Sequence, residues 1–426
     1  MKVLYSKFKQ ANGVSIDTRS IKGGELFFCL RGDNFNGNKF AQQALDSGAF
    51  LVIVDDSDYF IENTKMLLVE NSLKSLQELA KYHRKQLKIP VIGITGTNGK
   101  TTSKELITAI LSTHYRVLAT QGNFNNHIGV PLTLLQINNQ HEIAVIEMGA
   151  NHMGEIEDLC LLSQPNFGLI SNIGKAHLEG FGSFENIIQT KTALYRSVID
   201  NSGILFVNAD DKLLVEKAPK EKIEKYSSIT KTKVRVKPIK SDRYLQFYWD
   251  EHLIKTQLFG DYNLYNAAAA ISVGKYFDVP NAKIISALEK YSPSNNRSQL
   301  EIGKNNQLIL DAYNANPDSM DHAINSFNQA LFNNKAVILG DMLELGSFAH
   351  NEHLALLQKL NTLNFDKVYL VGPGFYALKN DFTHFSFFKN NLEALDFFTL
   401  NPLKAYRILL KGSRGIKLEI LKEQLL

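Results

Sequence analysis

A glycine-rich turn at residues 96–99 constrains the fold of this 426-residue chain more than any other feature. The residues before it, Val91–Thr95, are mostly apolar and predict a buried strand. The residues after it, 100–111, carry apolar side chains at helical spacing and predict an amphipathic helix. A strand, a glycine turn and a helix in this order are typical of α/β proteins that bind phosphate at the helix N-terminus.

The residue types in the turn indicate nucleotide binding. Gly96 and Gly99 let the backbone turn and approach a phosphate without a Cβ clash. Lys100 can reach the β- and γ-phosphates, and the hydroxyl of Thr101 can bind Mg²⁺. The general phosphate-loop pattern has a further glycine where this chain has Ile94. The residues expected at the nucleotide are Gly96, Thr97, Asn98, Gly99, Lys100, Thr101 and Thr102.

Apolar runs alternate with amphipathic stretches along the whole chain, which is the pattern of βαβ units and of an α/β fold. Strands are predicted at Phe50–Val54, Met66–Val69, Val91–Thr95, Ile143–Met148, Gly168–Ser171, Ile204–Asn208, Leu308–Asp311, Ala336–Gly340, Lys367–Val371 and Tyr406–Lys411. At roughly 150 residues per domain, the length suggests about three domains. We expect boundaries near Lys88–Pro90, where a proline can begin a strand, and near Tyr291–Asn296, which is polar and turn-rich.

Three side chains downstream of the turn are candidates for a shared site. Glu147 ends an apolar run, where a carboxylate can bind Mg²⁺, although a helix cap or a surface acid fits the pattern equally well. His177 also follows a strand and a glycine turn, but a lone histidine is more often structural. Lys191 lies on a predicted helix, 187–198, where a lysine is usually only solvated.

Composition limits the possible function and location. The net charge is +4 without a long run of Lys or Arg, so nothing indicates nucleic acid, and an anionic small substrate fits better. Cys29 and Cys160 have no metal-ligand spacing and are expected to be buried reduced thiols. The N-terminus lacks a signal-peptide pattern, and no apolar run is long enough to span a membrane. We therefore expect a cytoplasmic protein.

Taken together, the order and spacing of these motifs resemble the Mur ligase family. The loop at 96–102 is that family's form of the phosphate loop, which accounts for Ile94. The resemblance implies that Glu147 and His177, with Thr101, bind Mg²⁺, and that Lys191 is carbamylated and helps to bind a second Mg²⁺. Family members often follow this lysine with Gly-Glu, where this chain has Thr192-Ala193. By the same resemblance, the catalytic residues are Lys100, Lys191, His177 and Glu147.

The resemblance extends to residues beyond these motifs. It implies that Asn263 and Asn266 lie near the adenine, although they could also simply cap the Ala-rich helix that follows. It implies that Arg297 and Asp311, from a third domain, reach the γ-phosphate and the ribose. Three stretches, 121–131, 146–156 and 311–320, point to the member that adds a D-alanyl-D-alanine dipeptide. Candidate substrate-binding residues are Ser15, Asp17, Arg19, Arg31, Asn125, Asn126, Asn314 and Asn316, with a plain surface role as the alternative for the two arginines.

The resemblance implies an α/β fold with three domains. These are a UDP-substrate-binding domain at 1–88, a central phosphate-loop ATPase domain with a mostly parallel sheet at 89–294, and a Rossmann-like domain at 295–426 that closes over ATP and binds the dipeptide. It implies a ligase that uses ATP and Mg²⁺, in two sites, to join D-alanyl-D-alanine to UDP-N-acetylmuramoyl-tripeptide through an acyl phosphate. We expect a monomer that binds no nucleic acid and has no membrane span.

Other functions fit parts of the pattern. A related ligase could add a diamino acid or extend folate with glutamate, although the His-Thr-Pro-Asp and Asp-Asn-Pro-Arg motifs of the diamino-acid enzyme are absent. A phosphate-loop kinase would form no amide, and a silent nucleotide-binding module would not need Lys100, Thr101, Glu147 and His177 together. The third residue of the peptide substrate could be lysine or diaminopimelate.

Overall fold

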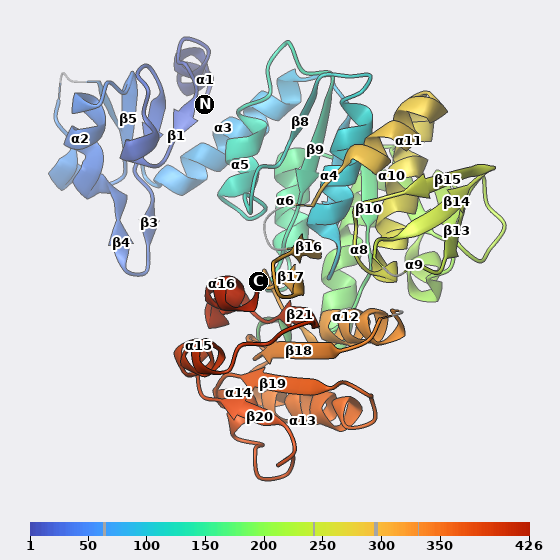
Figure 1. The fold of residues 1–426 in the computed structure, drawn as a ribbon. Helices are drawn as coiled ribbons and strands as arrows, with labels where there is room; N and C mark the ends of the chain where they lie inside the picture. The colour runs from blue at the N-terminus through green and yellow to red at the C-terminus, as the bar shows by residue number, and fades with distance from the viewer. Residues whose placement is uncertain (63–64, 242, 294–296, 331) are drawn as a thin grey trace.

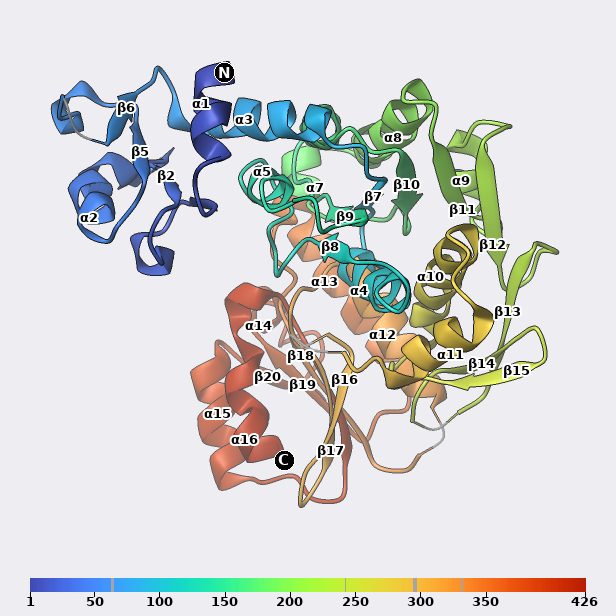
Figure 2. The ribbon, with the colours of Figure 1, turned by 90° about the horizontal axis from the view of Figure 1, so that it is seen from above.

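The computed structural model describes residues 1–62, 65–241, 243–293, 297–330 and 332–426, and it forms three α/β units, each built on its own sheet (Figure 1). The first unit lies to one side of the central one, and the third packs against another side of the central unit. Helix α3 (Ser72–Gln86) extends from the first unit to the central unit, as the view from above shows (Figure 2).

The first sheet has four parallel strands in the order β1-β2-β5-β6. They are β1 (Val14–Ser15), β2 (Leu26–Phe28), β5 (Leu51–Val54) and β6 (Met66–Leu68). Helices α1 (Lys2–Phe8) and α2 (Ala41–Asp46) accompany the sheet, and a short hairpin of β3 (Arg31–Gly32) and β4 (Phe35–Asn36) projects from it. Strand β2 is fully apolar and buried, which anchors this small core.

The central sheet has nine strands in the order β15-β14-β13-β12-β11-β10-β7-β9-β8, parallel from β8 to β13 and antiparallel in the ribbon β13–β15. They are β7 (Val91–Thr95), β8 (Val117–Ala119), β9 (Ile143–Glu147), β10 (Phe167–Ile170), β11 (Ile204–Asn208), β12 (Ile223–Ser227), β13 (Val234–Ile239), β14 (Gln246–Trp249) and β15 (His252–Lys255).

Helices cover both faces of this sheet, as a parallel sheet requires. One face packs on α4 (Lys100–Leu111), α10 (Leu264–Tyr276) and α11 (Asn281–Lys290). The other packs on α3, α5 (Gly129–Leu134), α6 (Glu155–Ser163) and α8 (Phe184–Asp200), with the short α7 (Leu178–Phe181) nearby. Ile92 and Ile94 of β7 face α4, so the strand that leads into the phosphate loop is fixed in the core.

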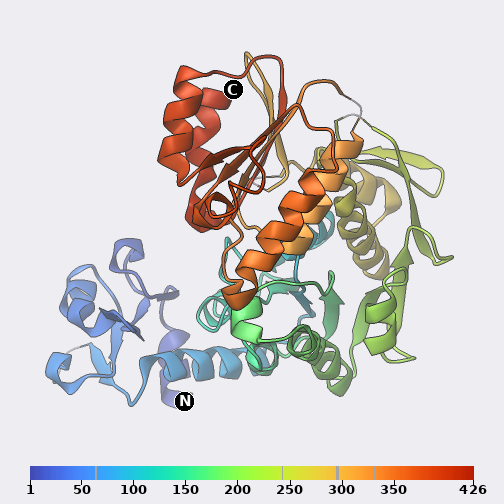
Figure 3. The same ribbon diagram turned by 90° about the horizontal axis from the view of Figure 1, so that it is seen from below.

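The third sheet has six strands in the order β16-β17-β21-β18-β19-β20, parallel except for the edge strand β16. They are β16 (Gln299–Ile302), β17 (Gln307–Asp311), β18 (Lys335–Gly340), β19 (Lys367–Val371), β20 (Ser386–Phe388) and β21 (Arg407–Lys411). The helices of this unit are α12 (Pro317–Gln329), α13 (Ala349–Leu360), α14 (Pro373–Tyr376), α15 (Asn391–Leu400) and α16 (Lys422–Leu425). Helices α12 and α13 lie on the side that meets the central unit (Figure 3).

The α/β class is confirmed, and all ten predicted strands are present with each boundary within one residue of its prediction. The other strands were not predicted, among them the ribbon β13–β15, whose strands are short and have exposed side chains at six of fourteen positions. The predicted boundary at 294/295 lies outside the described residues, and the division at 1–88, 89–294 and 295–426 stays a prediction. Among the described residues, no helix is long and apolar enough to cross a membrane.

Candidate active site

A cavity of about 1170 Å³ lies between the central and third units, lined by residues of both. It opens where β7, β9 and β10 end in one sheet and where β17 and β21 end in the other. Carboxyl ends of parallel strands are the usual ligand sites of open α/β sheets. The volume slightly exceeds the usual range for a single small-molecule pocket, so a nucleotide and a second substrate can be held together.

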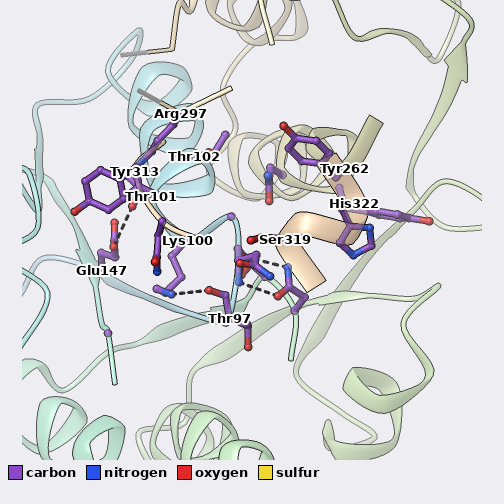
Figure 4. A pocket seen from close by; sticks show the side chains of 18 of the residues that line it. Thr97, Lys100, Thr101, Thr102, Glu147, Tyr262, Arg297, Tyr313, Ser319 and His322 are labelled. Atoms are coloured by element: carbon purple, nitrogen blue, oxygen red, sulfur yellow. Dashed lines mark hydrogen bonds between the residues drawn. The ribbon is translucent and has the colours of Figure 1, made fainter. Parts of the chain in front are cut away.

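The predicted phosphate loop forms one wall of this cavity (Figure 4). Gly99 caps α4 with φ of 78°, a left-handed conformation that side chains disfavour, and a Cβ there would lie 2.5 Å from Oδ1 of Asn266. Nζ of Lys100 donates to the carbonyl oxygens of Gly96 at 2.7 Å and Thr97 at 3.0 Å. Burial lowers the pKa of Lys100 to about 8, an effect that the nearby charge of Glu147 opposes. A lysine held against its own loop in this way gains a stronger partner when a phosphate arrives.

Two asparagines of the central unit, Asn263 and Asn266, pack beside the phosphate loop and the start of α4. Oδ1 of Asn266 accepts a hydrogen bond from Oγ of Ser103 on α4 at 3.0 Å, and its Nδ2 donates to Oδ1 of Asn263 at 2.9 Å. Asn263 in turn donates to the carbonyl of Phe259. Both asparagines are buried and line the cavity, as a place near the nucleotide requires. The alternative capping role is wrong, because the side chain of Asn263 makes no capping hydrogen bond to α10 and Asn266 lies within that helix.

Glu147 has the features of a metal ligand. Its side chain is 1% exposed, and its Oε1 accepts from Oγ1 of Thr101 at 3.1 Å and from Nδ2 of Asn125 at 2.8 Å. Its Oε2 has no hydrogen-bond partner among the described residues, which leaves a buried acceptor that a cation would satisfy. The residues therefore fit a magnesium ion. The described residues contain no group of three His, Cys, Asp or Glu side chains that could hold a metal by themselves, so water and phosphate oxygens would have to complete its shell.

His177 lines the same cavity but also contacts the third unit. Its Nδ1 hydrogen-bonds to the carboxylate of Glu344, which follows β18. This bond, with burial opposing it, holds the pKa of the Glu344 carboxyl below its ordinary value.

Lys191 lies under the phosphate loop and is absent from the cavity wall. Its Nζ is buried and donates to the carbonyl of Gly96 at 3.1 Å, beside the ring of Phe181. Burial, reinforced by repulsion from Lys100, lowers its pKa well below the ordinary lysine value. A neutral amine is the form that reacts with carbon dioxide, so this environment is compatible with the predicted carbamate, which stays a prediction.

The third unit contributes charged residues to the opposite wall. The guanidinium of Arg297 lies 3.7 Å from the ring centroid of Tyr313, a cation–π contact (Figure 4). Asp311 at the end of β17 forms a salt bridge of 2.7 Å with Lys411 at the end of β21. The two residues are paired in the sheet register, so parallel strands bring them side by side.

The segment after β17 connects this wall to the phosphate loop. Asn316 caps α12 by accepting from the backbone N–H of Ser319 at 2.8 Å, within a capping box. Its Nδ2 also donates to Oδ1 of Asn98 at 2.9 Å. Asn314 lines the cavity, and its carbonyl accepts from Lys411 at 3.2 Å. The predicted dipeptide-binding stretch thus lies against the nucleotide loop.

The sequence matches three protein-family models in succession. Residues 10–94 match the Mur ligase family catalytic domain, residues 94–274 the Mur ligase middle domain, and residues 296–414 the Mur ligase glutamate ligase domain. The chain belongs to the Mur ligase family.

Relatives of this Mur ligase cover nearly its full length. It is 34% identical to the UDP-N-acetylmuramoyl-tripeptide--D-alanyl-D-alanine ligase of Bacillus subtilis, over 97% of this chain and 93% of that protein. It is 32% identical to the enzyme of the same name from Rickettsia prowazekii, over 96% and 94%. Among solved structures, it resembles MurF from Acinetobacter baumannii with a TM-score of 0.87, 30% identity and coverage of 97% and 93%. It also resembles MurF from Thermotoga maritima in complex with ADP, with a TM-score of 0.84, 25% identity and 97% coverage of both chains.

The predicted residues of the first unit lie apart from the cavity of this Mur ligase. Arg19 is exposed and forms a salt bridge with Asp17, while Oγ of Ser15 donates to the Asp17 carbonyl at 2.9 Å. Arg31 binds the carboxylate of Asp55 at 2.8 Å. These groups gather at the carboxyl ends of β1, β2 and β5, a second edge at which a ligand could bind.

Two asparagines that precede α5 contribute to the cavity of this Mur ligase in different ways. Asn125 holds Glu147, as described above, and its carbonyl accepts from the backbone N–H of Gly149 at 2.8 Å. Asn126 lines the cavity and caps the start of α5 by accepting from the N–H groups of Ile128 and Gly129.

Sequence reasoning missed several cavity residues of this Mur ligase. They are Asp210, Tyr262, Tyr265, Tyr313, His322, Asn325, Glu344 and Lys411. Figure 4 shows Tyr262 and His322 on the opposite side of the phosphate loop from Glu147. Lys411 and Asp210 could have been found, because Lys411 is the last residue of a predicted strand and Asp210 comes soon after the end of another. His322 and Asn325 lie mid-helix on α12 and carry no such signal.

Proposed function

We propose that this chain joins D-alanyl-D-alanine to UDP-N-acetylmuramoyl-tripeptide with ATP, giving UDP-muramoyl-pentapeptide, ADP and phosphate. The relatives from Bacillus subtilis and Rickettsia prowazekii are named for this reaction. The observation that carries the proposal is a cavity lined both by the phosphate loop and by Asn314 and Ser319 of the third unit. Because one cavity is lined by the phosphate loop and by the third unit, a nucleotide and an amine donor can bind in it side by side.

The reaction proceeds by activation of a carboxylate, which is otherwise a poor electrophile. A carboxylate oxygen of the tripeptide attacks the γ-phosphorus of ATP, and the bond to the β,γ-bridging oxygen breaks to release ADP. The resulting acyl phosphate is attacked at its carbonyl carbon by the free amine of D-alanyl-D-alanine. The amine loses a proton, phosphate leaves from the tetrahedral intermediate, and an amide remains.

The chain contributes mainly charge and placement. Lys100 exchanges its loop carbonyls for the γ-phosphoryl oxygens and offsets the charge that they carry during transfer. Arg297 adds a second positive group from the third unit. Thr101, Glu147 and His177 would hold Mg²⁺, which supplies charge neutralisation at the phosphates when bound. Closure of the third unit excludes water and protects the acyl phosphate from hydrolysis.

We further propose a carbamate on Lys191 and a second magnesium ion beside it. The support is the buried, deprotonation-prone amine directly under the loop. Ala193 stands where relatives often have a glutamate, so the carbamate would lack that neighbour. A mass increase of the native protein that bicarbonate promotes and Lys191→Arg abolishes would support it. An unmodified Lys191 in active enzyme would refute it.

We assign the three units to three tasks along the proposed division at 1–88, 89–294 and 295–426. The first binds the UDP end of the substrate through Ser15, Asp17, Arg19 and Arg31, the second binds ATP, and the third binds the dipeptide through Asn314 and Asn316. Because the residues of the cavity come from one chain, a monomer suffices. ATP and a nucleotide-linked precursor are cytoplasmic compounds, so we place the reaction there.

Phosphate release from ATP tests this function directly. Purified protein is given UDP-N-acetylmuramoyl-tripeptide carrying lysine or diaminopimelate, with D-alanyl-D-alanine added or withheld. We expect release to require both substrates and mass spectrometry to show the tripeptide extended by the dipeptide. Release without the dipeptide, together with a stable phosphorylated product, would instead support a kinase. Stimulation by a diamino acid or by glutamate with folate would support one of the related ligases.

A further inference from the structure

The loop between β10 and α7 of the central unit, residues 171–177, is bound to the third unit through side-chain contacts. The backbone N–H of Lys175 donates to the carboxylate of Asp318 at 2.6 Å, and its Nζ lies 3.3 Å from the carboxylate of Glu352. Two residues further on, His177 bonds to Glu344. In Figure 3 the light green helix α7, which follows His177, lies at the end of the orange helix α13, whose preceding turn follows Glu344. The loop that presents His177 to the nucleotide cavity is therefore placed by the third unit.

The bond to Glu344 determines which nitrogen of His177 is available. A carboxylate can only accept a hydrogen bond, so Nδ1 of the imidazole must carry the proton. In the neutral ring, Nε2 then keeps its lone pair, which is the form of histidine that binds a metal. Metal-binding histidines commonly donate their other ring N–H to a carboxylate, which sets the tautomer and the ring orientation.

The backbone at His177 and Glu344 adopts a conformation that these residue types disfavour. His177 has φ of 51° and Glu344 has φ of 62°, both left-handed values that residues other than glycine disfavour. The backbone N–H of Glu179 also reaches the carbonyl of Glu344 at 3.4 Å, a second link at the same point. Disfavoured backbone persists where the surrounding structure imposes it, and it gathers at sites where placement matters.

We propose that Glu344 is a positioning residue that fixes His177 with Nε2 free for magnesium, so that the metal site is complete only when the third unit has closed. This inference rests on the proposed function, because it assigns a metal to the cavity. Closure then does more than exclude water. It brings the acceptor that orients a ligand of the central unit, and nucleotide-bound metal is retained only in the closed arrangement.

The test measures metal affinity, which needs neither the peptide substrates nor turnover. Mn²⁺ replaces Mg²⁺ because free Mn²⁺ is counted by its electron paramagnetic resonance signal. Wild-type protein, Glu344→Ala and Glu352→Ala are titrated with Mn²⁺ in the presence of ADP. Glu352→Ala is the matched control, since it removes another ion pair between the same loop and the same unit without touching His177.

We expect Glu344→Ala to weaken Mn²⁺ binding by about 10- to 100-fold, the usual effect of removing a carboxylate behind a metal-binding histidine. Glu352→Ala should change it by less than about threefold. In a His177→Ala background, Glu344→Ala should have no further effect, because it acts through the imidazole. Circular dichroism and small-angle scattering of each variant check that the fold and the closed shape are kept.

Three outcomes would overturn the proposal. They are unchanged Mn²⁺ affinity in Glu344→Ala, an equal loss in Glu352→Ala, and an undiminished effect of Glu344→Ala when His177 is already absent. The first would mean that Glu344 does not support the metal. The second would mean that Glu344 only holds the two units together, as Glu352 does. The third would mean that Glu344 does not act through His177. If the ligase assay fails but Glu344→Ala still weakens Mn²⁺ binding in a way that depends on His177, the proposed substrates are rejected and this inference stands.

Discussion

The side-chain amides of Asn98 and Asn316 hydrogen-bond to each other across the boundary between the central and third units. Nδ2 of Asn316 donates to Oδ1 of Asn98 at 2.9 Å, and Nδ2 of Asn98 donates back at 3.4 Å. Asn98 belongs to the phosphate loop, and Asn316 caps the helix that follows the predicted dipeptide segment. The nucleotide loop and the amine side of the cavity are thus in direct contact.

This contact predicts coupling between the two residues. Asn316→Asp keeps the oxygen that caps α12 but removes the donor to Asn98. We expect kcat/KM for ligation to fall by about fivefold to tenfold, since one such hydrogen bond contributes about 1 kcal/mol. Asn98→Ala should cost a similar amount, and the double variant little more than either one. Fully additive losses in this double-mutant cycle would show that the two side chains act independently.

Replacing Lys100 with alanine should abolish ligation. The amine is the group on the loop that can offset charge on the transferring phosphoryl, so we expect at least about a hundredfold loss of kcat. The fold should survive, because the hydrogen bonds that Nζ donates among the described residues go to carbonyls of its own loop. Thermal unfolding of the variant checks this point. Turnover close to that of the wild type would refute the proposed mechanism.

The lowered pKa of Lys100 predicts that ADP affinity depends on pH. In the free enzyme burial brings this pKa to about 8, and bound phosphates stabilise the charged amine, so binding takes up a proton as the pH passes 8. The dissociation constant should therefore rise above pH 8, by at most about tenfold per pH unit. Calorimetry in two buffers of different ionisation enthalpy measures the uptake. It should disappear in Lys100→Arg, and its persistence there would assign it to another group.

Alanine substitutions at two glycines separate the effect of backbone strain from the effect of a steric clash. Gly99 and Gly154 both cap helices with φ near 80°, but only Gly99 has a neighbour, Asn266, where a Cβ would lie. Alanine at either position should cost about 1–2 kcal/mol of unfolding free energy from left-handed strain. Gly99→Ala should in addition displace Asn266 and weaken ADP binding by more than tenfold. Equal stability and equal ADP affinity in the two variants would contradict the close packing at Gly99.

The two cysteines should be unreactive in the native protein. Cys29 and Cys160 are both buried, and burial raises the pKa of each thiol to about 12. The thiolate is the reactive form, so alkylation at pH 8 should be negligible until the protein unfolds. Mass spectrometry after iodoacetamide treatment should show no adduct without denaturant and two with it. Rapid labelling of either thiol in the native state would contradict this burial.

The sequence by itself determined the features that depend on local pattern. The order of strand, glycine turn and helix at Val91–Leu111 specified the phosphate loop, because the strand core and the two glycines leave few other conformations. Apolar runs located ten of the strands, which are spread over all three sheets, because a buried strand needs apolar side chains on both faces. The asparagine and proline at 316–317 likewise encoded the start of α12 through capping chemistry.

Only the tertiary structure decided which distant residues meet. The pairing of His177 with Glu344, and of Asn98 with Asn316, joins residues 167 and 218 positions apart. No periodicity or motif encodes such pairs, because they depend on how two separately folded units are packed together. The burial of Lys191 was also decided by the tertiary structure. In the sequence Lys191 resembled a solvated lysine on a helix. It lies under the phosphate loop because α8 packs against β7 and β10.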